Sequence, residues 1–294
     1  MKYFNRYTQT IEEESVPGEG CLRFLYHTKL GFCFLHLFFK RAWISKLAGW
    51  WMNQTRSKKK IPVFIKKYNI DVDCFEKKLE DYSHFNDFFY RKFKEGERPI
   101  DPNPDQVCFP AEGRHLGFQM IEDMQKFFVK GKSFGLKALL NEEYLSQRYQ
   151  GGTCVISRLA PTDYHRFHFP CDCIPRKIQL INGFLFSVNP IALKRSFRIL
   201  NENKRWLTEL ETEKFGTVTM IEVGACCVGS VQETFMEQIP VKKGDEKGYF
   251  LFGGSTVITL FEYGKVVLSR DLLDCTKRGL ELYAHVKDVM GFKK

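Results

Sequence analysis

A serine that follows two glycines is the first group in this sequence that could do chemistry. Gly253, Gly254 and Ser255 stand within YFLFGGSTVITLFEYGKVVL, between two apolar, strand-forming runs. Glycine reaches backbone conformations that other residues resist, and Gly254 leaves its carbonyl unshielded, so the Ser255 hydroxyl could attack it. A hairpin turn or bulge with the glycines at the bend is the alternative interpretation of the same residues.

The second candidate is the run LAPTDYHRFHFP at 159–170. It places Asp163, His165 and His168 close together, in a chain with 7 histidines. A carboxylate beside an imidazole is the arrangement that orients a general base. In an extended strand Asp163 and His165 share one face and His168 points to the other, whereas a turn would let the histidines converge. A surface turn with a local Asp–Arg pair is the alternative.

Two shorter motifs carry weaker signals. Glu112 stands in the Pro/Gly-defined loop FPAEGRH at 109–115, where the β-prone part of the chain begins. The run VGACCVGSV at 223–231 has small residues that could line a pocket or could pack in a core. The 10 cysteines show no CxxC spacing, so we expect buried free thiols in a reducing compartment and no metal site.

The positive charge of the chain is concentrated in one segment. Residues 21–70 contain eleven Lys and Arg and no Asp or Glu, while the whole chain has a net charge of +10. Such a segment attracts an anionic partner, either nucleic acid or acidic lipid. Its most apolar run, residues 30–39, is far shorter than the roughly 20 residues that span a bilayer. The tryptophans beside the basic residues favour a helix lying in the membrane interface over a buried helix of a soluble core; they are Trp43, Trp50 and Trp51.

The spacing of hydrophobic residues along the chain predicts a helical region followed by a β-rich one. Residues 1–20 are polar and are expected to be flexible. Hydrophobic spacing predicts one or two helices over 21–56 and further helix over 62–94. Prolines then mark a boundary near residue 105.

After residue 106, short β-prone runs alternate with turn residues, with one short helix expected at 134–148. The predicted fold class is therefore α+β: a helical, membrane-docking region over 21–105 and a mostly β catalytic domain over 106–294.

Taken together, the motifs resemble those of the pyruvoyl-dependent phosphatidylserine decarboxylases of the prokaryotic type. The likeness covers about residue 21 to about residue 270, with the motifs in the same order as in that family. They are FNDFFYRKFKEGERPID at 85–101, PAEG, DYHRFH, NPIA at 189–192, VGACCVGS and GYFLFGGSTV.

The resemblance implies a proenzyme that cleaves itself between Gly254 and Ser255. The products would be a β chain of residues 1–254 and an α chain of residues 255–294, held together as a heterodimer. Ser255 would become a pyruvoyl cofactor, which decarboxylates phosphatidylserine to phosphatidylethanolamine through a Schiff base and needs no metal.

The same resemblance implies which residues activate the serine. His165 or His168 would be the base, with Asp163 beside them. Glu112 takes the place where the family usually has Asp. Because Glu is one methylene longer, either this loop is set back or the relay depends more on Asp163.

The implied partners are the phosphatidylserine substrate and an anionic membrane surface, without nucleic acid. We expect a peripheral protein on the cytoplasmic side of the cell membrane, and the family suggests dimers. Two other functions remain open. A serine hydrolase would use Ser255 without self-cleavage, although the chain lacks a G-x-S-x-G elbow. A non-catalytic lipid- or nucleic-acid-binding module would be indifferent to Ser255.

Overall fold

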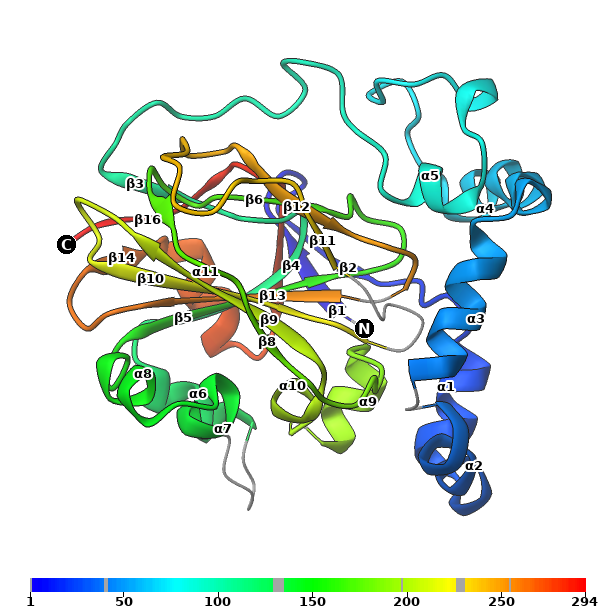
Figure 1. The fold of residues 1–294 in the computed structure, drawn as a ribbon, viewed down its shortest axis with the longest axis horizontal. Helices are drawn as coiled ribbons and strands as arrows, with labels where there is room; N and C mark the ends of the chain where they lie inside the picture. The colour runs from blue at the N-terminus through cyan, green and yellow to red at the C-terminus, as the bar shows by residue number, and fades with distance from the viewer. Residues whose placement is uncertain (1, 40–41, 129–134, 197, 226–230, 254) are drawn as a thin grey trace.

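The computed structural model describes residues 2–39, 42–128, 135–196, 198–225, 231–253 and 255–294 (Figure 1). Gly254 of the predicted cleavage site and the cysteine pair of VGACCVGSV lie outside these residues, as does the side chain of Trp43.

A large, mostly antiparallel sheet forms the centre of the molecule. Its strand order is β2-β1-β15-β4-β5-β13-β10-β9-β7, and β8 also pairs with β9. The strands are β1 (Lys2–Asn5), β2 (Thr10–Glu13), β4 (Gly113–Phe118), β5 (Thr153–Leu159), β7 (Ile174–Pro175), β8 (Gln179–Ile181), β9 (Arg205–Glu211), β10 (Thr217–Val223), β13 (Ser255–Phe261) and β15 (Glu281–Ala284).

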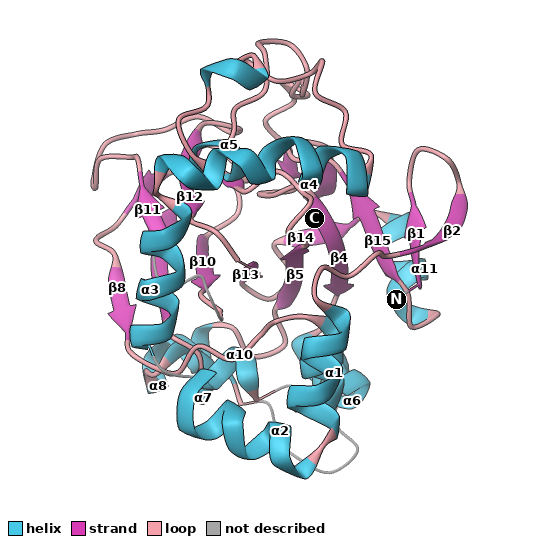
Figure 2. Ribbon diagram, turned by 90° about the vertical axis from the view of Figure 1, so that its right-hand side faces the viewer, coloured by secondary structure: helices cyan, strands magenta, loops and turns pink. Residues whose placement is uncertain are grey.

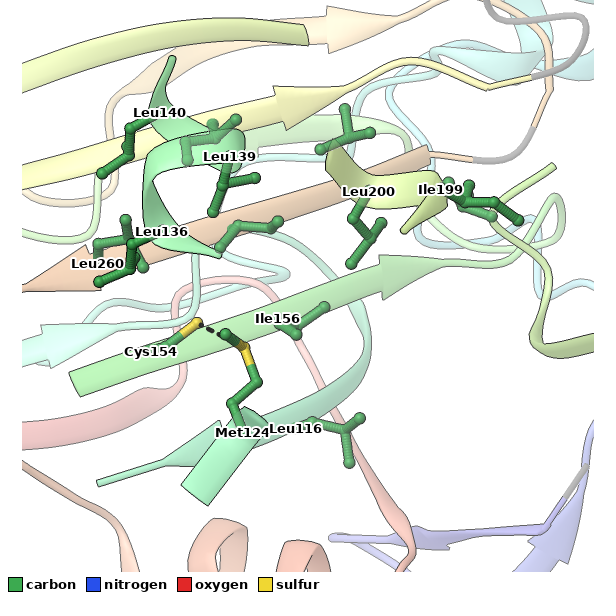
Figure 3. Close-up of a cluster of buried hydrophobic side chains, with 14 of the residues drawn as sticks. Leu116, Met124, Leu136, Leu139, Leu140, Cys154, Ile156, Ile199, Leu200 and Leu260 are labelled. Carbon is green, nitrogen blue, oxygen red and sulfur yellow. Dashed lines mark hydrogen bonds between the residues drawn. The ribbon is translucent and has the colours of Figure 1, made fainter. Parts of the chain in front are cut away.

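The central strands β5, β13 and β10 are buried on both faces, and each combines four apolar residues with three polar or charged ones. Short helices cover one face: α6 (Ile121–Phe128), α7 (Leu136–Leu140), α8 (Glu143–Arg148), α9 (Pro190–Arg195) and α10 (Ile199–Glu202). Figure 3 shows the core beneath them, where leucines of α7 and α10 pack over β5 and β13. The helix predicted over 134–148 is thus present as α7 and α8.

Two three-stranded sheets and one helix enclose the core on the opposite face. Their members are β3 (Gln106–Cys108), β6 (Arg166–His168), β11 (Val231–Glu233), β12 (Glu246–Phe250), β14 (Val266–Leu268), β16 (Val289–Lys293) and α11 (Arg270–Lys277). The predicted α+β class is confirmed in its coarse form, a mixed fold with large sheets.

The N-terminal helices gather beyond one end of the large sheet (Figure 1), and Figure 2, viewed from that side, shows them spread around the end of the sheet. They are α1 (Glu19–His27), α2 (Lys29–Phe34), a π-helical turn (Leu35–Phe39), α3 (Ala42–Met52), a 3₁₀ turn (Thr55–Lys59), α4 (Lys60–Tyr68), a second 3₁₀ turn (Leu79–Asp81) and α5 (Phe85–Phe89). Within the described residues, no helix has the length and apolar character needed to cross a bilayer.

The helical prediction over 62–94 is only partly correct. Helix α4 ends at Tyr68, where Asn69 takes a left-handed conformation, and only two short helical segments follow. The aromatic side chains that produced the helical spacing instead converge from separate turns on one buried cluster; among them are Phe75, Tyr82, Phe85, Phe88 and Phe89.

The N-terminal segment also differs from the flexible start that we expected. Strands β1 and β2 form a hairpin, and β1 runs parallel to β15 at the edge of the sheet. Arg6 forms an ion pair with Asp271, and Glu14 forms a buried one with Arg158. These partners lie more than 140 residues away in sequence, so local composition could not reveal them.

Candidate active site

Ser255 is the first residue of β13, and it pairs with Leu159 at the end of β5. Its side chain is fully buried, and its hydroxyl oxygen has no hydrogen-bond partner in the described part of the chain. Buried hydroxyls are normally bonded, so an orphaned one indicates a functional role or an unseen group. Just upstream, Gly253 has φ 137°, a backbone conformation that side-chain-bearing residues rarely adopt.

Sheet pairing brings the 159–170 motif to this serine. The chain leaves β5 beside Ser255, turns through residues 160–165 and returns as β6, which pairs with β12. The Phe250 N–H then donates to the carbonyl of His165 at 2.9 Å. Ser255 thus lies at the end of the β5–β13 pair, and His165 lies at the end of the β6–β12 pair. Gly253 belongs to the short connection between β12 and β13, which joins the two pairs.

His165 is fully buried, and its ring packs on Phe89 with 3.8 Å between the centroids. Its Nδ1 is 2.9 Å from the carbonyl oxygen of Asp163. A carbonyl can only accept, so Nδ1 carries the hydrogen and Nε2 of the neutral ring has a free lone pair.

No described residue meets the geometry of a hydrogen bond with this Nε2, although the backbone of Gly253 lies close enough to act on the ring and to raise its pKa. Burial and the nearby Arg91 lower the pKa of His165 to about 3. The ring is neutral at physiological pH and is available as a proton acceptor.

His168 has a different environment. Its Nδ1 is 2.8 Å from the Gly244 carbonyl, and its Nε2 is 3.3 Å from the hydroxyl of Tyr164. Burial lowers its pKa to about 3 as well. Both nitrogens of His168 are bonded, one of them to the turn before β12, while His165 presents an open nitrogen.

Asp163 supports His165 through its backbone. Its carboxylate is buried, pairs with Arg114 and accepts the N–H of Ala160 at 2.7 Å. Burial raises its pKa, and the arginine opposes that rise. The sequence suggested a carboxylate beside the imidazole; in the structure this carboxylate closes the loop, and the Asp163 carbonyl orients His165.

Glu112 is buried at the start of β4. Its carboxylate pairs with Arg98, 2.7 Å from the guanidinium Nε, and accepts a hydrogen bond from the Tyr283 hydroxyl at 3.4 Å. The next residue, Gly113, packs directly on the backbone of β5, and a Cβ at this position would lie only 2.4 Å from the Arg158 carbonyl oxygen. The loop thus holds β4 close to β5, next to the strand that begins with Ser255.

Helix α5 supplies contacts that the sequence motifs did not single out. Arg91, just after the helix, is buried and donates to the carbonyls of Thr162 at 2.8 Å and Asp163 at 3.0 Å. It therefore holds the loop that carries His165. The family-like run at 85–101 was the only signal for this contribution.

A buried charge cluster lies on the strands around the site and was also missed. The Lys247 ammonium is 3.1 Å from carboxylate oxygens of Glu222 and Glu233. Burial raises the pKa of Glu222, and the Lys247 ammonium opposes that rise. The cluster links β10, β11 and β12.

An apolar cavity of about 280 Å³ opens beside the serine segment. Its lining includes Leu22 and Leu25 of α1, Phe64 of α4, Phe252 and Gly253. A larger cavity of about 730 Å³ is lined mainly by polar and charged residues of the N-terminal segment, α1 and α9, and its lining does not include the serine segment. The smaller cavity is therefore the one suited to a substrate of the site.

Comparison with known proteins gives one consistent result. The family model described as "Phosphatidylserine decarboxylase" matches residues 85–277. A protein of Fusobacterium nucleatum named phosphatidylserine decarboxylase proenzyme is 44% identical over 294 residues, which are 100% of this chain and 98% of that protein.

Two further relatives bear the same name. The Chlamydia caviae protein is 44% identical over 96% of this chain and 94% of its own length, and the Clostridium novyi protein is 40% identical over 100% and 99%. The chain belongs to the phosphatidylserine decarboxylase family.

Proposed function

We propose that this decarboxylase matures by cutting its own chain between Gly254 and Ser255, and that it then converts phosphatidylserine to phosphatidylethanolamine. One observation carries the proposal. Two buried atoms without hydrogen-bond partners in the described residues, Ser255 Oγ and His165 Nε2, belong to segments that meet around Gly253.

Self-cleavage begins when Ser255 Oγ attacks the carbonyl carbon of Gly254. A neutral imidazole of the 163–168 loop accepts the hydroxyl proton, and the peptide becomes an ester. Loss of the Ser255 α-proton then expels residues 1–254 as a carboxylate and leaves dehydroalanine at 255. Hydrolysis of this residue releases ammonia and leaves the pyruvoyl group.

The local structure fits such a group. The Ser255 hydroxyl is buried, lacks a partner among the described residues and stands beside the apolar cavity that includes Gly253. The pyruvoyl carbonyl supplies an electron sink for the loss of carbon dioxide. A proton that His165 Nε2 has first accepted is delivered from there to the product carbon, and the rings of Phe89 and Phe252 exclude water on that side.

The two chains would remain associated after cleavage. Strand β13 of the new α chain lies between β5 and β10, and β15 lies between β1 and β4. The interrupted core therefore stays closed, and a heterodimer of 1–254 and 255–294 is the mature form.

Residues 21–105 would dock the enzyme on an anionic membrane, and residues 106–294 would form the catalytic domain. Trp50 is 59% exposed and Trp51 is 44% exposed, and Lys60 lies 3.8 Å over the ring of Trp51. Exposed aromatic and apolar side chains next to positive charge favour the headgroup layer. This arrangement supports peripheral attachment at the cytoplasmic face of the cell membrane.

The test is decarboxylation of phosphatidylserine in mixed vesicles by the purified protein and by Ser255→Ala. We expect cleaved, active wild type and an intact, folded, inactive variant. Hydrolysis of the lipid by an uncleaved chain, without loss of carbon dioxide, would instead support a serine hydrolase. Equal vesicle binding by both proteins, with no product from either, would support a binding module.

A further inference from the structure

The segment that would be cut is anchored on its upstream side by one buried amide. The backbone N–H of Phe252 donates to Oδ1 of Asn86 at 2.8 Å. Downstream, Ser255 is fixed by its pairing with Leu159. Two residues separate the anchors, so Phe252 is held very close in sequence to the bond that would be cut.

Asn86 is itself firmly held. It is fully buried in α5, and its Nδ2 donates to Oδ1 of Asn53 at 2.7 Å. An N–H can only donate, so the Phe252 contact requires the Asn86 oxygen on that side and the amide nitrogen on the Asn53 side. Both ends of the amide are therefore assigned by their partners.

Aromatic packing fixes the same helix against both halves of the site. The Phe252 ring lies 5.4 Å from that of Phe85 and 5.2 Å from that of Phe89, measured between centroids. Phe89 also packs on His165 at 3.8 Å. Helix α5 thus contacts the segment to be cut and the candidate proton acceptor at once.

We propose that Asn86 is a positioning residue for self-cleavage, an inference that rests on the proposed function. Its Oδ1 holds the Phe252 N–H and so fixes the upstream side of the segment that must present its scissile bond to Ser255 Oγ. A displacement of about 1 Å at such a site can cost on the order of 10²-fold in rate. After cleavage there is no longer a bond between residues 254 and 255 to position. Asn86 is therefore needed for self-cleavage and not for the later turnover of substrate.

The experiment compares Asn86→Ala, Asn86→Asp and Asn203→Ala. Asn203 is a matched control, because it is equally buried and its Oδ1 also accepts a backbone N–H, that of Phe186 at 2.9 Å. The rate of appearance of the two fragments is measured for each purified precursor. Decarboxylation is measured per cleaved chain. Thermal melting is measured in an uncleavable Ser255→Ala background.

We expect Asn86→Ala to cleave about 10- to 100-fold more slowly than Asn203→Ala at a similar loss of melting temperature. Asn86→Asp keeps an acceptor oxygen for the Phe252 N–H but loses the donor to Asn53, and it recovers part of the rate. Turnover per cleaved chain changes less than threefold in both Asn86 variants.

The inference is overturned if Asn86→Ala cleaves as fast as Asn203→Ala, or if Asn86→Asp cleaves no faster than Asn86→Ala. Absence of cleavage in the wild type would instead overturn the proposed function itself.

Discussion

Replacing His165 by alanine should remove the open imidazole nitrogen beside Gly253 and with it most of the activity. General acid–base catalysis contributes about 10²- to 10⁴-fold, which corresponds to about 3–5 kcal/mol of activation free energy. Truncation of a buried ring also costs stability, about 3–5 kcal/mol by analogy with phenylalanine. The two effects need a control that separates them.

His115 provides that control. It is fully buried like His165, its ring packs on Phe109 at 4.0 Å, and burial lowers its pKa to about 3. Its nitrogens, however, are bonded to Ser157 Oγ at 2.9 Å and to the Ala284 carbonyl at 3.4 Å. His115→Ala should lose similar stability without losing an open proton acceptor.

The assay follows phosphatidylethanolamine formation per milligram of protein, and a gel of the same sample gives the cleaved fraction. We expect His165→Ala to fall at least 100-fold below His115→Ala. The gel then assigns the loss to cleavage, to turnover or to both. If the two variants agree within tenfold, the open nitrogen of His165 has no role in the reaction.

Three further predictions concern the neighbouring histidine, acid stability and membrane binding. His168→Ala removes the contacts with Gly244 and Tyr164 and should therefore slow self-cleavage into the two fragments. Normal cleavage and turnover in both His165→Ala and His168→Ala would place the base outside this loop. The lowered pKa of His115 means that the unfolded chain binds a proton below about pH 6.5 that the folded chain does not bind, so stability is lost as the pH falls towards 3. Between pH 6.5 and 5.5, the free energy of unfolding measured with denaturant should therefore fall by about 1 kcal/mol less in His115→Gln than in wild type. Parallel plots of this free energy against pH for the two proteins would contradict the prediction. In a flotation assay, binding to liposomes should require anionic lipid and should weaken with salt, because the Debye length falls from about 10 Å at 0.1 M to about 3 Å at 1 M. Insertion of Trp50 and Trp51 should leave some binding at high salt. Binding that is independent of lipid charge and salt would exclude the basic segment as the docking surface.

The sequence was most informative where a motif is local. The Gly-Gly-Ser run named Ser255, and the 159–170 motif named His165 and His168 without choosing between them; the structure brings the two segments together. Strand-forming texture after residue 106 likewise predicted the large sheets.

Long-range pairing explains what could not be predicted. The Asp163 carboxylate meets Arg114, 49 positions away, and this pairing redirects it from the imidazole. The contact of Asn86 with Phe252 spans 166 positions, and no sequence pattern around either residue predicts the contact. Aromatic residues after Tyr68 mimicked a helical period because one buried cluster collects them from several turns.

The most direct test of self-cleavage at Ser255 is the intact mass of the purified protein, with and without borohydride reduction. We predict two polypeptides, one ending at Gly254 and one that begins at position 255 with a pyruvoyl group in place of serine. Reduction should add two hydrogens to the second chain alone. A single uncleaved chain in an active preparation, or a second chain that begins with an unmodified serine, would contradict the proposed maturation.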